Sequence, residues 1–127
     1  MPVAEEFQYA VLRVVPRLER GEAINAGVVL FCRRLSFLAA RVQLDRARLA
    51  ALDSEADADA IERHLDSLAR IAAGEEGAGP IAALPQSERF SWLVAPASTI
   101  VQPSPVHTGF CDDPEGRLER LFEELVV

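Results

Sequence analysis

The chain has 127 residues, half of them hydrophobic and 26% charged. This length and composition are typical of one soluble domain, which buries about two-thirds of the surface of its unfolded chain. No stretch approaches the ~18 uninterrupted apolar residues of a membrane helix, and acids near the start replace the basic segment of a secretory signal. We therefore expect a single domain over residues 1–127, located in the cytoplasm and without a membrane partner.

The formal net charge is −7 and is unevenly distributed. Residues 1–50 carry eight arginines and five acids, a net of +3, whereas residues 51–127 carry five arginines and fifteen acids, a net of −10. Because most of such a surface would repel a polyanion, nucleic-acid binding is disfavoured. A small anionic ligand held on the first half is still compatible with this charge.

The first predicted element is a strand over residues 7–15. Its residues alternate between two faces that are both mostly apolar, with Arg13 as the exception. A strand that is apolar on both faces is typical of the centre of a sheet. Pro16 ends it, since proline cannot donate a backbone hydrogen bond to the next strand.

Two more strands are predicted over residues 24–32 and 37–44, which with the first form an antiparallel meander. Gly21 in the first connection suits a turn residue with positive φ. Gly27 interrupts the second strand, which indicates a bulge or a close approach of two backbones.

Two helices follow the meander. Residues 45–52 predict a short helix, and residues 57–73 place apolar side chains on one stripe at helical spacing. Gly74 stands where a C-terminal cap belongs. The acids that precede the longer helix suit the positive end of its dipole, and we interpret them as a solvated cap, not as metal ligands.

The last third of the chain predicts two short strands, 89–94 and 99–102, among several prolines. A final helix begins at Asp113, a favourable N-cap followed by proline. The order β-β-β-α-α-β-β-α predicts an α+β fold, a mostly antiparallel sheet with helices packed on it.

Arg13 is the first residue that packing alone does not explain. A charge inside a central strand needs a partner, because an unpaired buried charge is costly. One interpretation is an internal salt bridge with Glu22. The other is that Arg13, Asn25 and Arg41 project from adjacent strands into one cleft and hold an anionic group.

Glu22 and Asn25 lie at the entry to the second strand and have two interpretations. Asn25 could fix the turn through side-chain hydrogen bonds to the backbone, which is the commoner role of such residues. Alternatively, Glu22 is a general base or a metal ligand.

A second group of polar residues lies in the last third of the chain: Arg89, Trp92, Ser98, Thr99, Gln102, Ser104, His107 and Thr108. So many polar residues beside prolines suggest a functional loop. Within it, Trp92 is expected in the core. His107 is either a general acid or base near neutral pH or an ordinary surface residue, and His64 is expected on the surface.

The remaining chemistry is unremarkable. Cys32 and Cys111 have no metal-ligand spacing and are expected to be free thiols. The sequence contains no glycine-rich phosphate loop, zinc-ligand spacing or nucleophile elbow, so we expect neither a cofactor nor a metal.

Three segments resemble a known family: YAVLRVVP (9–16), RGEAINAGVVLF (20–31) and WLVAPASTIVQPSPVHTG (92–109). Together they resemble DUF3037, an uncharacterised bacterial domain family, over nearly the whole chain. The family has no assigned activity, so the resemblance implies no reaction. It implies a small bacterial protein that serves as an accessory subunit, with a HipA-like kinase as its partner.

Two functions are therefore expected. The first is an accessory domain that binds a protein partner. The alternative is a small enzyme or ligand-binding domain acting on a phosphorylated or nucleotide-like anion. The alternative needs the two polar groups to meet around one cleft formed by Arg13, Glu22, Asn25, Arg41, Arg89, Gln102, Ser104 and His107.

Overall fold

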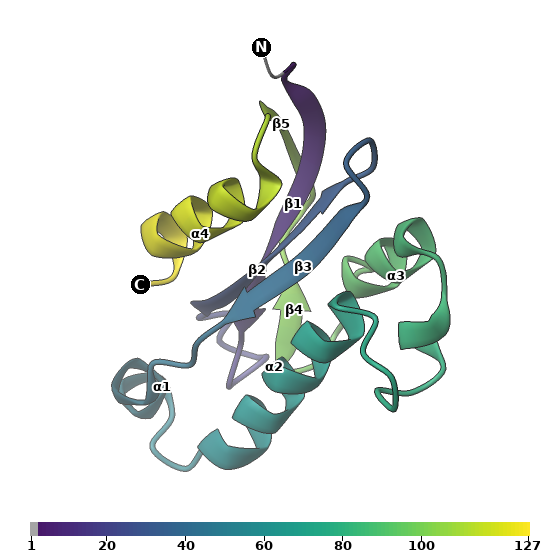
Figure 1. Ribbon diagram of the computed structural model, residues 1–127. Coiled ribbons are helices and arrows are strands. Elements are labelled where there is room, and N and C mark those ends of the chain that lie inside the picture. The colour runs from purple at the N-terminus through teal and green to yellow at the C-terminus, as the bar shows by residue number, and fades with distance from the viewer. Residues whose placement is uncertain (1–2) are drawn as a thin grey trace.

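A computed structural model describes residues 3–127 and shows one five-stranded antiparallel sheet (Figure 1). The strands are β1 (Glu5–Val14), β2 (Ile24–Cys32), β3 (Phe37–Val42), β4 (Val101–Pro103) and β5 (His107–Cys111). Their order is β3-β2-β1-β4, and β5 also pairs with β1. Because β4 pairs with the second half of β1 and β5 with the first half, the two short strands share one side of β1.

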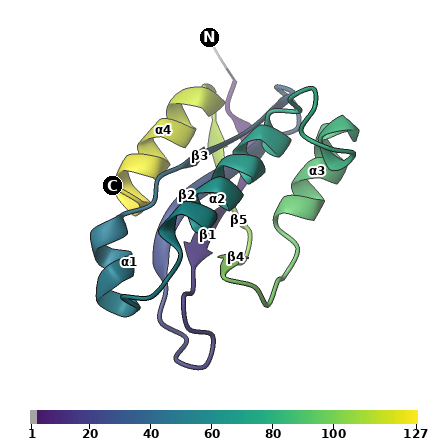
Figure 2. The same cartoon turned by 90° about the horizontal axis from the view of Figure 1, so that it is seen from below.

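Helices cover both faces of this sheet. They are α1 (Arg46–Leu52), α2 (Ala58–Ala72), the 3-10 turn η1 (Ile81–Ala83), α3 (Gln86–Leu93) and α4 (Pro114–Leu125). Helix α4 lies on one face, and α2 and α3 lie on the other (Figures 1 and 2). The α+β prediction is therefore confirmed.

Strand β1 occupies the centre of the sheet, as its two apolar faces predicted. Ala10, Leu12 and Val14 belong to the core under α2 and α3. Phe7 belongs to a second core, which α4 closes with Leu118 and Phe122, among others. Burying both faces of β1 explains why its sequence has no polar face.

Gly27 shows both features that were predicted for it. The register between β1 and β2 shifts between Leu12 and Arg13, so β2 carries an irregularity here. A Cβ atom on Gly27 would lie 2.9 Å from the carbonyl oxygen of Arg41 and 2.9 Å from a methyl carbon of Val42. Only glycine allows β3 to approach β2 this closely.

The predicted helix ends are also confirmed. Asp57 and Asp113 cap α2 and α4 through hydrogen bonds to the backbone N–H groups of Ala60 and Gly116. Gly74 follows α2 with a φ of 67°, and its N–H donates to the carbonyl of Ile71. These caps fix both ends of α2 and the start of α4.

The strand predicted for residues 89–94 is wrong, because residues 89–93 lie in helix α3 and Val94 is its C-cap. As a result the side chain of Trp92 is 45% exposed and does not enter the core. Strand β4 begins two residues later than predicted, and β5 lies in a segment expected to be a loop. The order of strands and helices is otherwise as expected, with α3 as an additional short helix.

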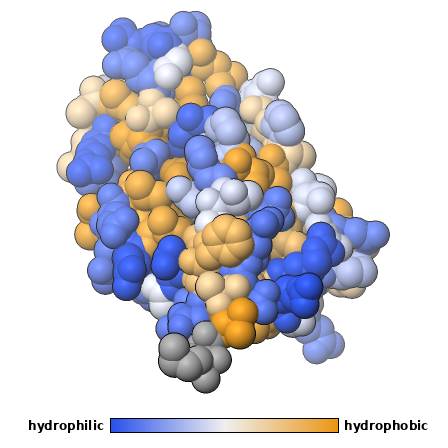
Figure 3. Space-filling view, turned by 90° about the horizontal axis from the view of Figure 1, so that it is seen from above, coloured by the Kyte–Doolittle hydropathy of each residue, from blue (hydrophilic) through white to orange (hydrophobic). Residues whose placement is uncertain are grey.

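The end of the molecule that is seen from above in Figure 3 has a mixed surface, with hydrophobic residues scattered among hydrophilic ones. Leu35 and Phe110 are among the exposed apolar side chains of the protein. Scattered apolar residues are normal on a protein surface and do not by themselves mark a binding site.

Candidate functional site

Three of the predicted polar residues meet across the sheet. Arg13 on β1 pairs with Asn25 on β2 and with Gln102 on β4. Because directly opposed residues of antiparallel strands point to the same face, all three side chains lie on the α4 side of the sheet. One residue of the second polar group, Gln102, therefore joins Arg13 and Asn25 of the first in a row that we call the Arg13 row.

The guanidinium of Arg13 is poorly satisfied. Its one hydrogen bond is a long one, 3.4 Å from Nη2 to the carbonyl oxygen of Pro103. Its Nε is buried without a hydrogen-bond partner. Within residues 3–127 no carboxylate lies within 4 Å of it. The group therefore retains the capacity to bind an anion.

The neighbours of Arg13 are committed to backbone contacts. Asn25 donates from Nδ2 to the carbonyl of Leu125, the last residue of α4, at 2.9 Å. Gln102 donates from Nε2 to the carbonyl of Thr99 at 2.9 Å. Asn25 thus anchors the end of α4, a contact 100 residues away in the chain and not within its own turn.

Glu22 and Arg41 do not join the row. Glu22 lies in the exposed β1–β2 loop and pairs with Arg20, so the salt bridge expected with Arg13 is not formed. Arg41 pairs with Glu119 of α4 and places its guanidinium carbon 4.9 Å from the centre of the Phe122 ring. Its role is to hold α4 against β3.

Arg89 and Ser104 are placed where they support the fold. Arg89 lies on the other side of the sheet and donates to the carbonyls of Leu84, at 2.7 Å, and Ala72, at 3.4 Å. Ser104 is buried, and its hydroxyl accepts from the N–H of Val11 at 2.8 Å. Ser104 joins β1 to the segment between β4 and β5.

His107 lies on β5 opposite Tyr9, and the two rings are 5.2 Å apart between centroids. The imidazole is exposed, and no hydrogen bond from it to the described residues positions it for proton transfer. This geometry fits a surface stack on the sheet more closely than a general base.

A groove that was not expected from the sequence lies on the other face, between α2 and the segment that leads into β4. It consists of two adjoining hollows of about 370 and 300 Å³ that share His64 and Val101. The first is lined by Pro16, Asp53, Glu55, Ala56, Asp57, Ala60, Ile61, His64, Ile100 and Val101. The second is lined by Leu12, His64, Leu68, Trp92, Leu93, Ala95, Pro96, Ala97, Thr99, Val101 and Pro103. We call the two together the α2–β4 groove.

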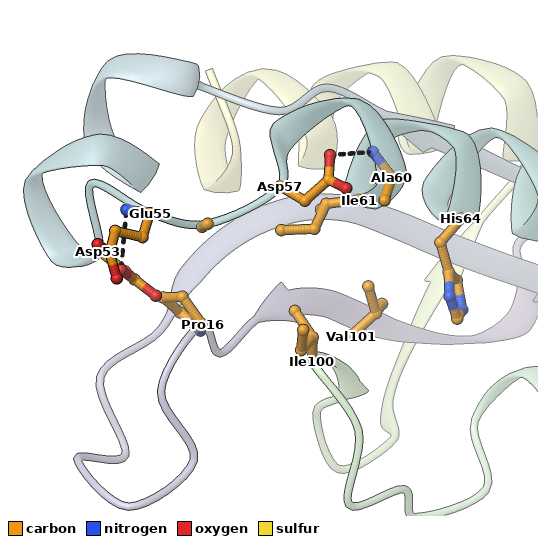
Figure 4. A pocket seen from close by; sticks show the side chains of 10 residues that line it. Pro16, Asp53, Glu55, Asp57, Ala60, Ile61, His64, Ile100 and Val101 are labelled. Atoms are coloured by element: carbon orange, nitrogen blue, oxygen red, sulfur yellow. Dashed lines mark hydrogen bonds between the residues drawn. The ribbon is translucent and has the colours of Figure 1, made fainter.

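Figure 4 shows the first hollow of this groove from close by. Ile61 and His64 descend from α2 toward Ile100 and Val101 on the opposite wall, and His64 stands at one end. Asp53 and Glu55 stand at the other end, beside Pro16. The hollow is therefore apolar along its length and acidic at one end.

Three acids that line the first hollow, Asp53, Glu55 and Asp57, form its acidic rim, and they have no cationic partner among residues 3–127. Asp53 accepts from the N–H of Glu55 and Asp57 from that of Ala60, both at 3.0 Å. Among the described residues, Asp53, Glu55 and Asp57 form no ion pair. Three carboxylates thus leave a negative potential beside an apolar surface.

The groove explains what the sequence interpretation missed. His64 is on the surface, as predicted, but it also lines both hollows. Trp92 lines the second hollow and is not a core residue, and Ile100, which lines the first hollow, is 43% exposed. The signal available in the sequence was two large apolar residues, Trp92 and Ile100, close to several prolines.

The described residues offer little for metal or thiol chemistry. No group of three or more His, Cys, Asp or Glu in residues 3–127 could hold a metal ion. Cys32 and Cys111 are both free and buried, as free thiols were predicted. Burial raises the pKa of the Cys111 thiol, and the nearby Cys32 adds to this effect, so the reactive thiolate is disfavoured.

The architecture defines an α+β domain with helices on both faces of the sheet and two candidate binding places, one on each face. The sequence model of the family described as protein of unknown function, DUF3037, matches residues 9–126. The chain belongs to this family, which confirms the resemblance of its three segments. Comparisons with curated proteins and with solved structures found no match. No helix among the described residues is long and apolar enough to cross a membrane.

Proposed function

We propose that this protein is an accessory domain that binds a partner protein through the α2–β4 groove. The observation that carries the proposal is the exposure of Trp92 and Ile100 at the walls of two adjoining apolar hollows. Large apolar side chains that line a concave surface are typical of binding sites, and tryptophan is enriched among the residues that dominate interface energy.

The size of the groove supports a protein ligand. The two hollows together exceed what a single side chain occupies, since an apolar cavity of about 150 Å³ already holds a benzene-sized group. Their lining residues come mainly from α2 and from the loop that precedes β4, so they form a surface groove and not an enclosed cavity. Several consecutive side chains of a partner fit such a shape better than one compact ligand does.

The first partner to test is a HipA-like kinase, which the family resemblance implies. This proposal places both proteins in the cytoplasm of a bacterium. Co-expression of the two proteins followed by size-exclusion chromatography measures whether they form a stoichiometric complex.

The groove is tested with a matched pair of variants. Ile100→Glu places a charge in the apolar hollow and should abolish complex formation. Phe110→Glu changes a side chain that is 64% exposed on β5, away from both hollows, and should leave the complex intact. A complex that survives Ile100→Glu, in a protein with an unchanged circular dichroism spectrum, would show that the groove is not the binding surface.

A second candidate function has its own supporting observation. The unsatisfied guanidinium of Arg13, beside Asn25 and Gln102, suits a phosphorylated or nucleotide-like anion. Titration with inorganic phosphate or a nucleotide, followed by NMR, should then shift the backbone amides of these three residues. Shifts confined to other parts of the chain would remove the Arg13 row as an anion site.

A further inference from the structure

The chemistry of the α2–β4 groove also indicates what kind of segment fills it. We propose that the occupant is an amphipathic helix of the partner whose apolar face enters the two hollows and whose Lys or Arg side chains reach the rim of Asp53, Glu55 and Asp57. This inference rests on the proposed function and specifies the ligand of the same site.

Two features of the hollows require an apolar face with at least two anchors. Each hollow has room for one or two large side chains, judged against the ~150 Å³ that accepts a benzene-sized group. The hollows adjoin at His64 and Val101, so the anchors must be close neighbours on one face of the ligand. A helix presents such neighbours three or four residues apart.

The neighbouring edge strand argues against the other common mode, in which the partner adds a strand to the sheet. An added strand needs free backbone groups along β4. The carbonyl of Val101 already accepts from the hydroxyl of Thr99 at 2.9 Å, and that of Pro103 accepts from Arg13. Pro103 also has no N–H to donate. With only three residues, β4 therefore offers an added strand little backbone to pair with, which favours contact through side chains.

The sign of the ligand's charge follows from the rim. Asp53, Glu55 and Asp57 have no cationic partner within the described residues, and residues 51–127 carry a net charge of −10. An acidic helix would be repelled from this end of the groove, whereas a basic residue next to the apolar anchors would be attracted. Charge thus selects basic amphipathic helices among all helices that could fill the hollows.

The test uses a phage-displayed library of random 16-residue peptides selected against the full chain. Peptides that lack tryptophan are then synthesised, and their binding is measured through the fluorescence of Trp92, the single tryptophan of the protein. The expected result is enrichment of peptides with apolar residues three or four apart and at least one Lys or Arg. Their binding should be lost with Ile100→Glu.

The charge requirement is tested with two triple variants that change the net charge equally. The rim variant is Asp53→Asn, Glu55→Gln and Asp57→Asn, in which asparagine preserves the helix cap of α2. The control is Asp112→Asn, Glu123→Gln and Glu124→Gln, which neutralises three exposed acids outside the groove. At low salt the rim variant should bind the peptides about fivefold more weakly and the control about equally, with the difference shrinking at ~0.5 M salt.

Each outcome separates this inference from the proposed function. Peptides that need Ile100 but ignore the rim variant, or that carry no basic residue, overturn the basic helix and leave the groove as a protein-binding site. Peptides that bind without needing Ile100, or a selection that enriches nothing, overturn the helical ligand, whereas the proposed function stands or falls with the kinase complex and its loss in Ile100→Glu.

Discussion

Replacing Arg13 by methionine distinguishes a structural role of this residue from a ligand-binding role. Methionine keeps the long apolar stem that packs on the sheet and removes only the guanidinium. In the structure that group makes one hydrogen bond, at 3.4 Å, and leaves a buried Nε without a partner. An orphaned buried donor costs roughly 1–3 kcal/mol, whereas a weak hydrogen bond contributes about 0.5 kcal/mol. The free energy of unfolding should therefore stay within about 1 kcal/mol of the wild type or rise.

The measurement is urea unfolding followed by far-UV circular dichroism, which does not depend on Trp92. Arg89→Met is the matched control, because the Arg89 guanidinium also has a buried Nε without a partner and a long bond of 3.4 Å, to Ala72, but adds a short one of 2.7 Å to the carbonyl oxygen of Leu84. Because the two variants remove an equivalent orphaned donor, losing the additional charged hydrogen bond should make Arg89→Met roughly 1.5–3 kcal/mol less stable than Arg13→Met. If Arg13→Met also lost more than about 2 kcal/mol at an unchanged m-value, the guanidinium would be holding the fold and the reasoning would be refuted.

Three further predictions concern stability and thiol reactivity. Gly27→Ala should lower the free energy of unfolding by roughly 1–3 kcal/mol in the same assay, because its Cβ would lie 2.9 Å from the carbonyl oxygen of Arg41. Ser104→Ala should cost roughly 1–3 kcal/mol and speed hydrogen exchange at the amide of Val11, which loses its acceptor. Unchanged exchange there would contradict the role given to the hydroxyl. Because burial raises the pKa of Cys111, its alkylation by iodoacetamide should need a higher pH than free cysteine, whose pKa is about 8.5. Rapid alkylation at pH 7 would instead show an accessible thiolate. The raised pKa also affects stability: its contribution is fully present below about pH 8.5 and is lost as pH rises through the pKa of the folded state.

The central strand and the helices were predictable because their signals are local. Residues 7–15 are mostly apolar on both faces, and this pattern alone predicts that helices cover the sheet on both sides of β1. The end of α2 at Gly74 and the start of α4 at Asp113 follow from cap chemistry that spans only a few residues. Each of these signals is complete within one short stretch of sequence.

The errors occurred where a short segment depends on distant contacts. Residues 89–94 are too few for their apolar pattern to separate strand from helix, and packing of Phe90 and Leu93 into the core makes them helical. Strand β5 contains glycine and polar residues, and it is a strand only because β1 offers it an edge.

The candidate sites show the same division. The shared face of Arg13 and Asn25 follows from the first hairpin, so the sequence could predict it. Arg89 was wrongly assigned to the polar site, because its segment is a helix on the other face of the sheet and not a strand. The α2–β4 groove is assembled from several separate segments of the chain, and no local pattern predicts such a site.

The late pairing of β4 and β5 with β1 has a consequence for synthesis on the ribosome. The hydroxyl of Ser104 meets the N–H of Val11 across 93 residues of sequence, so β1 emerges long before the strands that complete it. During that interval one side of a highly apolar strand offers free backbone groups to any nascent neighbour, which favours aggregation. We expect slow, post-translational completion of the sheet, and a benefit from chaperones that shield this side until residue 111 has left the exit tunnel.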